Sequence, residues 1–186
     1  MSRIANIDPA TATGAARQLL DAVHAQLGAT PNFIRVLANS PKALEGFLGL
    51  YGAAAGFSLD KAMQERIALT VGEGNACAYC VSAHTAIGRH AGLSNEEMLL
   101  NRQGSSGDAR AAAAVALARA LNDNLGEITQ AEFDAARSAG LSDAELVETI
   151  AVVALNIFTN ILGKATQVEI DFPKVSLLQS ASEQAA

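Results

Sequence analysis

Residues 59–91 read LDKAMQERIALTVGEGNACAYCVSAHTAIGRHA, and this stretch decides the fold. Apolar residues recur at helical spacing on both sides of its centre, which predicts helices over 59–73 and 76–91. The centre, Glu73-Gly74-Asn75-Ala76, has the composition of a tight turn, with Asn75 as the cap of the second helix. The stretch therefore predicts an antiparallel helical hairpin.

The rest of the chain has the same helical character. Half of the residues are hydrophobic, only 4% are aromatic and there is no tryptophan, a composition that favours closely packed helices over sheets. No alternating strand pattern occurs, so the sequence predicts an all-α fold. Capping signals mark helix starts at Thr30-Pro31, Ser40-Pro41, Ser94-x-x-Glu97, Thr129-x-x-Glu132 and Ser142-x-x-Glu145. The remaining helices are predicted at 12–27, 31–38, 41–55, 94–101, 107–124, 129–138 and 142–169.

The chain length fits a single domain, which we predict over residues 1–173. Residues 103–107 read QGSSG, a composition that predicts a flexible joint within this domain. Residues 174–186 form a tail that we expect to be loosely held or docked on a partner subunit. A faint repeat crosses the joint, since 59–68 resembles 141–151. This match predicts an internal duplication of the helical hairpin, although amphipathic helices also resemble one another by chance.

Charge and hydropathy argue against several classes of function. The net charge is −6 at pH 7 and the isoelectric point is near 5.0, which argues against nucleic-acid binding. The start of the chain lacks the apolar segment of a signal peptide. The most apolar stretch, 149–163, is shorter than the roughly 20 residues that a membrane span needs. We therefore expect a cytoplasmic protein with no membrane partner, in which a cysteine pair is catalytic or metal-binding rather than a structural disulfide.

The chemistry is concentrated in the hairpin, which holds both cysteines of the chain. Cys77, Cys80 and His84 are three and four residues apart, so a helix places them on one stripe. The two sulfurs can then form a disulfide across one turn, with His84 one turn beyond Cys80. Glu65 lies ten residues before Asn75 and His84 lies nine after it, so an antiparallel hairpin brings these two side chains level. A carboxylate, an imidazole and a thiol in this order form a proton-transfer chain.

Other polar residues near the motif have simpler interpretations. Both cysteines fall in the first turn of the second helix, where unpaired N–H groups favour the thiolate. Glu73, nearer the turn, is interpreted as a solvated carboxylate at the rim of the site. Tyr79 points away from the cysteine stripe and is assigned to packing or to the substrate wall. His24 and His90 are interpreted as surface histidines.

The motif does not fit common metal or haem sites, and we expect no metal and no cofactor. A structural zinc site takes four ligands, usually as two pairs, and this chain has one cysteine pair. Covalent haem attachment needs a histidine directly after the second cysteine, where Val81 stands. Zinc bound by Cys77, Cys80, His84 and Glu65 is kept as an alternative.

The pattern Glu65-(eleven residues)-Cys77-x-x-Cys80-x-x-x-His84 resembles the signature of the AhpD-like superfamily, also called the carboxymuconolactone decarboxylase superfamily. Residues 74–85 and the later run 150–173 resemble its peroxidase-related branch. The resemblance covers most of residues 30–173. It implies an AhpD-like helical bundle with a duplicated hairpin, which assembles as a homo-oligomer such as a trimer or a hexamer.

The resemblance also implies roles for the site residues. Cys80 is the peroxidatic thiolate, Cys77 is the resolving thiol, and His84 with Glu65 is the relay that activates Cys80. The substrate is a hydroperoxide and the reductant is an external dithiol. The alkylhydroperoxidase pattern has a second histidine between the cysteines, where this chain has Tyr79, which leaves the efficiency and the substrate open. Decarboxylation is not expected, since the true decarboxylases of the family act without the cysteine pair.

The leading prediction is therefore a two-thiol peroxidase with an antioxidant role. A general protein disulfide oxidoreductase, which passes electrons between partners, is one alternative. A redox-sensing helical oligomer, in which the cysteine pair controls assembly, is another.

Overall fold

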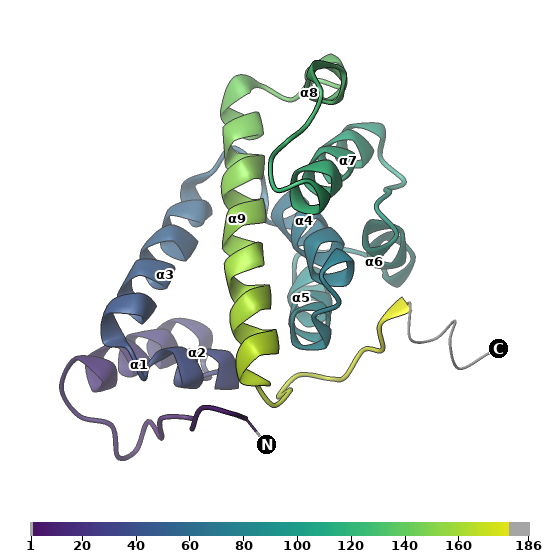
Figure 1. Ribbon diagram of the computed structural model, residues 1–186. Coiled ribbons are helices and arrows are strands. Elements are labelled where there is room, and N and C mark those ends of the chain that lie inside the picture. Colours follow the sequence, from purple (N-terminus) through teal and green to yellow (C-terminus); the bar gives the residue numbers. More distant parts are fainter. Residues whose placement is uncertain (1, 179–186) are drawn as a thin grey trace.

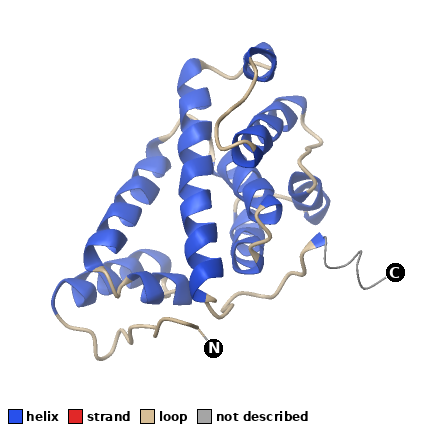
Figure 2. Cartoon of the chain, viewed as in Figure 1, coloured by secondary structure: helices blue, strands red, loops and turns tan. Residues whose placement is uncertain are grey.

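The protein is all-α, as the sequence predicts. A computed structural model describes residues 2–178, and every regular element in that range is a helix (Figures 1 and 2). The bounds agree with the predicted ones to within a few residues at each end. The elements are α1 (Gly14–Leu27), α2 (Asn32–Leu37), α3 (Pro41–Ala53), the 3-10 helix η1 (Ala54–Gly56), α4 (Lys61–Gly74), α5 (Ala78–His90), α6 (Asn95–Arg102), α7 (Ala109–Asp123), α8 (Gln130–Ser138) and α9 (Asp143–Thr166).

Helix α4 lies at the centre of the packing. It contacts α5, α6, α7 and α9, and its buried apolar side chains share one core with those of α7 and α9. A second core joins α1, α2 and α3 to α5 and includes Cys77, Cys80 and Tyr79. Figure 1 shows α1–α3 on one side of α9 and the hairpin of α4 and α5 on the other. The cysteine pair therefore belongs to the core that joins the N-terminal helices to the central hairpin.

Helix α9 has 24 residues and is long and apolar enough, by length and composition, to cross a membrane. The apolar stretch 149–163 noted in the sequence is only the middle part of this helix, which continues beyond it at both ends. The core helix of a globular protein passes the same test, and α9 packs against α4, α5 and α7. It also buries the polar side chains of Thr149, Asn156 and Asn160. Its composition alone therefore assigns no membrane location.

The two halves of the faint repeat fall in α4 and α9, which pack against each other. Helix α9 continues without a break where the first copy turns from α4 into α5. The internal duplication stays a prediction.

Four of the predicted helix caps are present, each with a side chain that accepts a hydrogen bond from a backbone N–H of the first turn. They are Ser40, Ser94, Thr129 and Ser142. The predicted cap at Thr30 is wrong. Helix α2 begins one residue later than expected, so Pro31 occupies the capping position and no side-chain hydrogen bond forms there.

The predicted reciprocal capping box of Ser94 and Glu97 is only half formed, because the Glu97 carboxylate turns toward residues 103–107. It accepts hydrogen bonds from the Ser106 hydroxyl and from the N–H of the next residue. It also pairs with Arg66 of α4 at 2.8 Å. This segment is therefore tied to both α6 and α4, and its flexibility as a joint stays a prediction.

Residues 168–178 form a C-terminal strap that leaves the end of α9 and runs past the hairpin (Figure 1). Backbone N–H groups of the strap donate hydrogen bonds to Ser82 of α5 and Glu73 of α4, and a strap carbonyl accepts one from Arg102 of α6. Glu73 and Arg102 also form an ion pair at 2.7 Å. Glu73 is therefore buried, and the prediction of a solvated rim carboxylate is wrong, because Arg102 and the strap cover it. The first part of the predicted tail thus docks on its own chain, and residues 179–186 lie outside the described residues.

Candidate active site

The turn between α4 and α5 positions the two cysteines. Helix α4 ends at Gly74, and Ala76 has a left-handed backbone with a φ of 50° that turns the chain back. Cys77 then takes the N-cap position of α5, where its sulfur accepts a hydrogen bond from the Cys80 N–H at 3.3 Å. The predicted cap, Asn75, instead ends α4, because its side-chain amide bonds to asparagines of α7 and α9.

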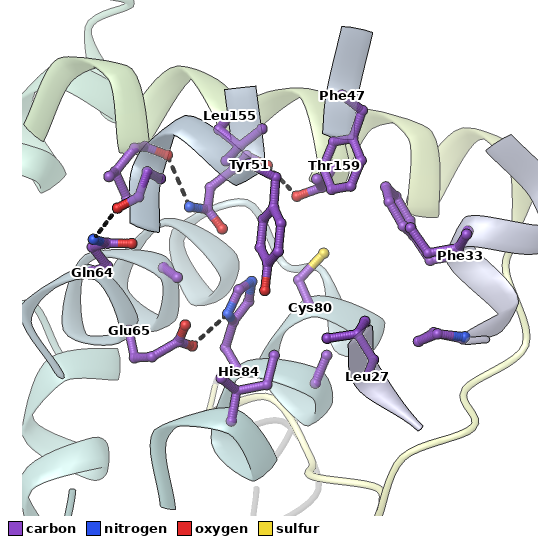
Figure 3. Close-up of a pocket in the computed structure, with 18 of the residues that line it drawn as sticks. Leu27, Phe33, Phe47, Tyr51, Gln64, Glu65, Cys80, His84, Leu155 and Thr159 are labelled. Atoms are coloured by element: carbon purple, nitrogen blue, oxygen red, sulfur yellow. Dashed lines mark hydrogen bonds and ion pairs between the residues drawn. The ribbon is translucent and has the colours of Figure 1, made fainter. Parts of the chain in front are cut away.

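Cys77 and Cys80 form a disulfide across this first turn, with their Cα atoms 5.3 Å apart. They are 1% and 3% exposed, respectively, but their surroundings differ. The Cys77 sulfur lies against Gly163 of α9, where an added Cβ would be 3.5 Å from it. Cys80 lines a cavity between the N-terminal helices, the hairpin and α9, and Figure 3 shows its sulfur directed into that space. Cys80 is thus the sulfur that a small molecule in the cavity would meet.

Glu65 and His84 meet across the hairpin, as their distances from the turn predict. Oε2 of Glu65 lies 2.7 Å from Nδ1 of His84 (Figure 3). The helices approach closely at Gly72, where an added Cβ would lie 3.5 Å from the Cβ of Cys80. Because the carboxylate faces Nδ1, we assign the proton of the neutral imidazole to Nδ1, which leaves Nε2 as an acceptor. His84 lines the same cavity as Cys80.

Lys61 also belongs to the site, although no sequence motif includes it. Its Nζ lies 2.7 Å from Oε1 of Glu65 and 5.5 Å from the centre of the Tyr51 ring. Burial is the largest influence on the pKa of Glu65 and would raise it. The charges and hydrogen bonds of His84 and Lys61 together outweigh burial, so the pKa of Glu65 is lowered. Glu65 is therefore a carboxylate that stays ionised while only 1% exposed.

The cavity has a volume of about 150 Å³ and a largely apolar lining. A cavity of about this size, lined by apolar side chains, can hold a benzene ring. Its aromatic wall consists of Phe33, Phe47, Tyr51, Tyr79 and Phe172. Its polar side chains are those of Gln26, Lys61, Gln64, Glu65, His84, Asn156 and Thr159. The site can therefore hold a small apolar molecule whose reactive polar group lies next to Cys80 and His84.

Tyr79 packs in the cavity wall, one of the two assignments made from the sequence, and it also anchors the strap. Its ring contacts Phe33 and Phe172. Its hydroxyl donates a hydrogen bond to Asp171 at 2.9 Å and accepts one from the Phe33 N–H at 3.2 Å. Burial raises the pKa of Tyr79 far above its usual value; the Phe33 N–H opposes this shift and the Asp171 carboxylate adds to it. The hydroxyl therefore keeps its proton and serves as an anchor.

His24 and His90 are exposed, as interpreted from the sequence. Among residues 2–178, no group of three or more His, Cys, Asp and Glu side chains is arranged to hold a metal ion. The four residues of the zinc alternative form a disulfide and a separate carboxylate–imidazole pair.

Fold and site define a class of protein: an all-α bundle that carries a CxxC disulfide on a helical hairpin, beside a buried carboxylate–imidazole pair. The sequence profile of the Carboxymuconolactone decarboxylase family matches residues 41–123, from α3 to α7. This part of the chain is therefore similar to the AhpD-like superfamily that the sequence motif resembles. No curated protein matches the chain significantly.

Three solved structures illustrate the likeness. An alkylhydroperoxidase AhpD core protein from Ralstonia eutropha, described as peroxidase-related, is 23% identical, with a TM-score of 0.82 over 91% of this chain and 92% of its own. A peroxidase-related protein from Silicibacter is 25% identical, with a TM-score of 0.75 over 82% of this chain and 83% of its own. A cysteine-to-alanine variant of the debrominase Bmp8, in complex with 2,3,4-tribromopyrrole, is 17% identical, with a TM-score of 0.78 over 100% of this chain and 98% of its own. The AhpD-like fold thus spans most of the chain.

Proposed function

We propose that the protein is a thiol-dependent peroxidase that reduces hydroperoxides through a dithiol–disulfide cycle of Cys80 and Cys77. One observation carries the proposal: Cys80 and the Glu65–His84 pair line the same small apolar cavity. A hydroperoxide in that cavity meets a sulfur nucleophile and a proton relay together. The family and the peroxidase-related neighbours support the same reaction class.

The cycle begins when Nε2 of His84 takes the proton of the Cys80 thiol. The thiolate attacks the outer oxygen of the hydroperoxide, the O–O bond breaks, and Cys80 becomes a sulfenic acid. His84 returns the proton to the leaving oxygen, which departs as an alcohol. Cys77 then attacks the sulfenic sulfur, which releases water and forms the Cys77–Cys80 disulfide. An external dithiol reduces this disulfide and is itself oxidised.

The burial of the disulfide favours a small substrate over a folded protein partner. Cys77 lies behind Cys80 against α9, and Cys80 faces the cavity. A general protein disulfide oxidoreductase presents its reactive sulfur at the surface, because a thiolate of the partner must reach it. If the protein were a general protein disulfide oxidoreductase, protein disulfides would oxidise its dithiol form and hydroperoxides would not.

The proposal is tested by hydroperoxide consumption with a dithiol reductant. The variant Cys80→Ser loses the nucleophile and should turn over at least about a hundredfold more slowly. Once the reductant has been removed, reduced Cys77→Ser should consume about one equivalent of hydroperoxide and stop as the Cys80 sulfenic acid, which a sulfenic-acid reagent then labels. His84→Ala should be slow, while His90→Ala, an exposed histidine of the same helix, should match the wild type.

Unchanged turnover in Cys80→Ser contradicts the proposal. A brominated pyrrole is a useful second substrate in the same assay, since the cavity is apolar and aromatic-lined and one neighbour of this fold is a debrominase. Consumption of the bromopyrrole but not of hydroperoxides would assign the cysteine pair to a different reaction.

We further propose that the protein is a cytoplasmic homo-oligomer, a trimer or a hexamer, that binds neither nucleic acid nor membrane. Contiguous exposed apolar side chains mark protein interfaces, and the exposed face of α9 carries such a stripe. It consists of Val147, Ile150, Ala154, Phe158, Ile161 and Ala165. The net charge of −6 argues against anionic partners. Comparing the oligomer size before and after oxidation separates a constitutive assembly from the redox-sensing alternative.

A further inference from the structure

The ion pair of Lys61 and Glu65 is placed unfavourably for the stability of α4. Lys61 is the first residue of α4, and the positive end of the helix dipole disfavours a cation there. The pair also places lysine four residues before glutamate, which is the weaker order for such pairs. Local helix stability therefore does not explain the contact.

Burial of the Glu65 carboxylate does explain it. Glu65 is 1% exposed, and a buried carboxylate without a cationic partner is costly to keep ionised. The Lys61 side chain is 48% exposed, so it reaches the carboxylate from the solvent side and keeps part of its own hydration. Burial is the largest single influence on the pKa of Lys61 and would lower it, but the charge and hydrogen bond of Glu65, together with Tyr51, outweigh burial and raise the pKa. Both partners are therefore charged in the folded protein.

The two oxygens of Glu65 are divided between two partners. Oε1 faces Nζ of Lys61, and Oε2 faces Nδ1 of His84, each at 2.7 Å. Lys61 thus fixes both the charge and the orientation of the carboxylate, and the carboxylate fixes the imidazole. The ring of Tyr51 from α3 lies beside the Lys61 ammonium. The cavity side chains from α9 carry no charge. Among the described residues, the titratable groups that line the cavity with Glu65 are Lys61, His84, Tyr51, Tyr79 and, once the disulfide is reduced, Cys80.

We propose that Lys61 is a positioning residue for the relay: it holds Glu65 as a carboxylate on Nδ1 of His84, so that Nε2 is free to take the Cys80 proton. The inference rests on the proposed peroxidase function. Lys61 acts through Glu65 and does not itself take part in the bond changes.

The pKa of Glu65 depends on the competition between burial and the neighbouring charges, so removal of the Lys61 charge should shift the pH dependence of the relay in one direction. Without the Lys61 charge, burial is compensated less and the pKa of Glu65 rises. A protonated Glu65 is a weaker acceptor for the Nδ1–H of His84, and its new O–H can instead donate to Nδ1, so the imidazole loses its fixed tautomer. Glu65 is protonated as the pH falls through its pKa, so a higher pKa means that Glu65 becomes protonated at a higher pH. The relay of a Lys61 variant therefore fails at a higher pH than that of the wild type.

The first test compares pH profiles of hydroperoxide turnover for Lys61→Met and Lys61→Arg. We expect the acid limb of Lys61→Met to move up by about one pH unit, which is about tenfold lower turnover on that limb. Lys61→Arg keeps the charge and should restore most of the wild-type profile. The matched control is Lys42→Met, because Lys42 forms a surface pair with Glu45 at 2.6 Å and should leave the profile unchanged.

The second test reads the His84 tautomer directly from the ¹⁵N shifts of its ring in the same variants. The Nδ1–H form should dominate in the wild type and in Lys61→Arg, and the Nε2–H form should appear in Lys61→Met. Wild-type tautomer and wild-type pH profile in Lys61→Met would overturn the proposal. Lys61→Gln replaces Lys61→Met if thermal unfolding shows that the latter does not fold. If the wild type consumes no hydroperoxide, the proposed function fails, and the tautomer still decides the role of Lys61.

Discussion

Glu65 and Glu73 are both buried carboxylates of α4. Glu65 faces Lys61, His84 and the cavity. Glu73 faces Arg102 and the backbone of the C-terminal strap. Glu65 holds the imidazole of His84, which lines the cavity where a small molecule can bind. Glu73 instead links α4 to α6 and to the C-terminal strap. At the scale of single residues, the partners of the carboxylate oxygens therefore distinguish the chemical role of Glu65 from the structural role of Glu73.

Tyr79 gives a prediction at the same scale. Tyr79→Phe keeps the ring but leaves the Phe33 N–H and one oxygen of Asp171 without this partner. A buried unsatisfied group costs about 1–3 kcal/mol, and we expect the free energy of unfolding in urea to fall by about that amount. The pH profile of turnover should stay that of the wild type, because the Tyr79 hydroxyl keeps its proton. A changed pH profile at unchanged stability would contradict the anchoring role.

At the scale of the elements, the α4–α5 hairpin could be predicted because local spacing specifies it. Counting outward from the turn brings Glu65 level with His84, and the 2.7 Å contact confirms this. Lys61 escaped prediction because a Lys and a Glu four residues apart commonly form an exposed surface pair, and nothing local shows that Glu65 is buried. The hydrogen bond between Tyr79 and Asp171 could not be predicted because the two residues are 92 positions apart, and helical periodicity gives no information about contacts at that separation.

The connection between α6 and α7 gives a prediction about pH. Burial raises the pKa of Glu97, but hydrogen bonds from Ser106, from the N–H after it, from Arg66 and from Asn101 outweigh burial and lower the pKa to about 2. A lowered pKa in the folded state stabilises the protein fully above the ordinary value of 4.5, and this stabilisation is lost as the pH falls toward 2. Unfolding in urea at several pH values should therefore show a flatter acid dependence for Glu97→Gln. Glu127→Gln, an exposed change, should keep the wild-type dependence, and equal slopes for both variants would contradict the assignment.

At the scale of the whole molecule, the cavity lies where separate parts of the chain meet. The N-terminal helices supply Phe33, Phe47 and Tyr51, the hairpin supplies Cys80, and the strap supplies Phe172. The family profile covers 41–123 only, so part of the cavity wall comes from outside the matched region. The reactive motif can therefore be predicted from one short stretch, whereas the shape that selects a substrate depends on long-range packing.

The exposed apolar stripe on α9 links the cavity wall to the proposed assembly. Phe158 lies on the stripe and stacks on Phe47 of the cavity wall, with ring centres 6.2 Å apart. A second copy of the chain packed on α9 would bury the stripe, and a charge there would be costly to bury. We therefore expect sedimentation velocity to show an oligomer for the wild type and a smaller species for Ile161→Glu. Leu99→Glu, an equally drastic change at an exposed apolar residue of α6, should keep the wild-type size. A monomeric wild type, or an unchanged Ile161→Glu, would contradict assembly through α9.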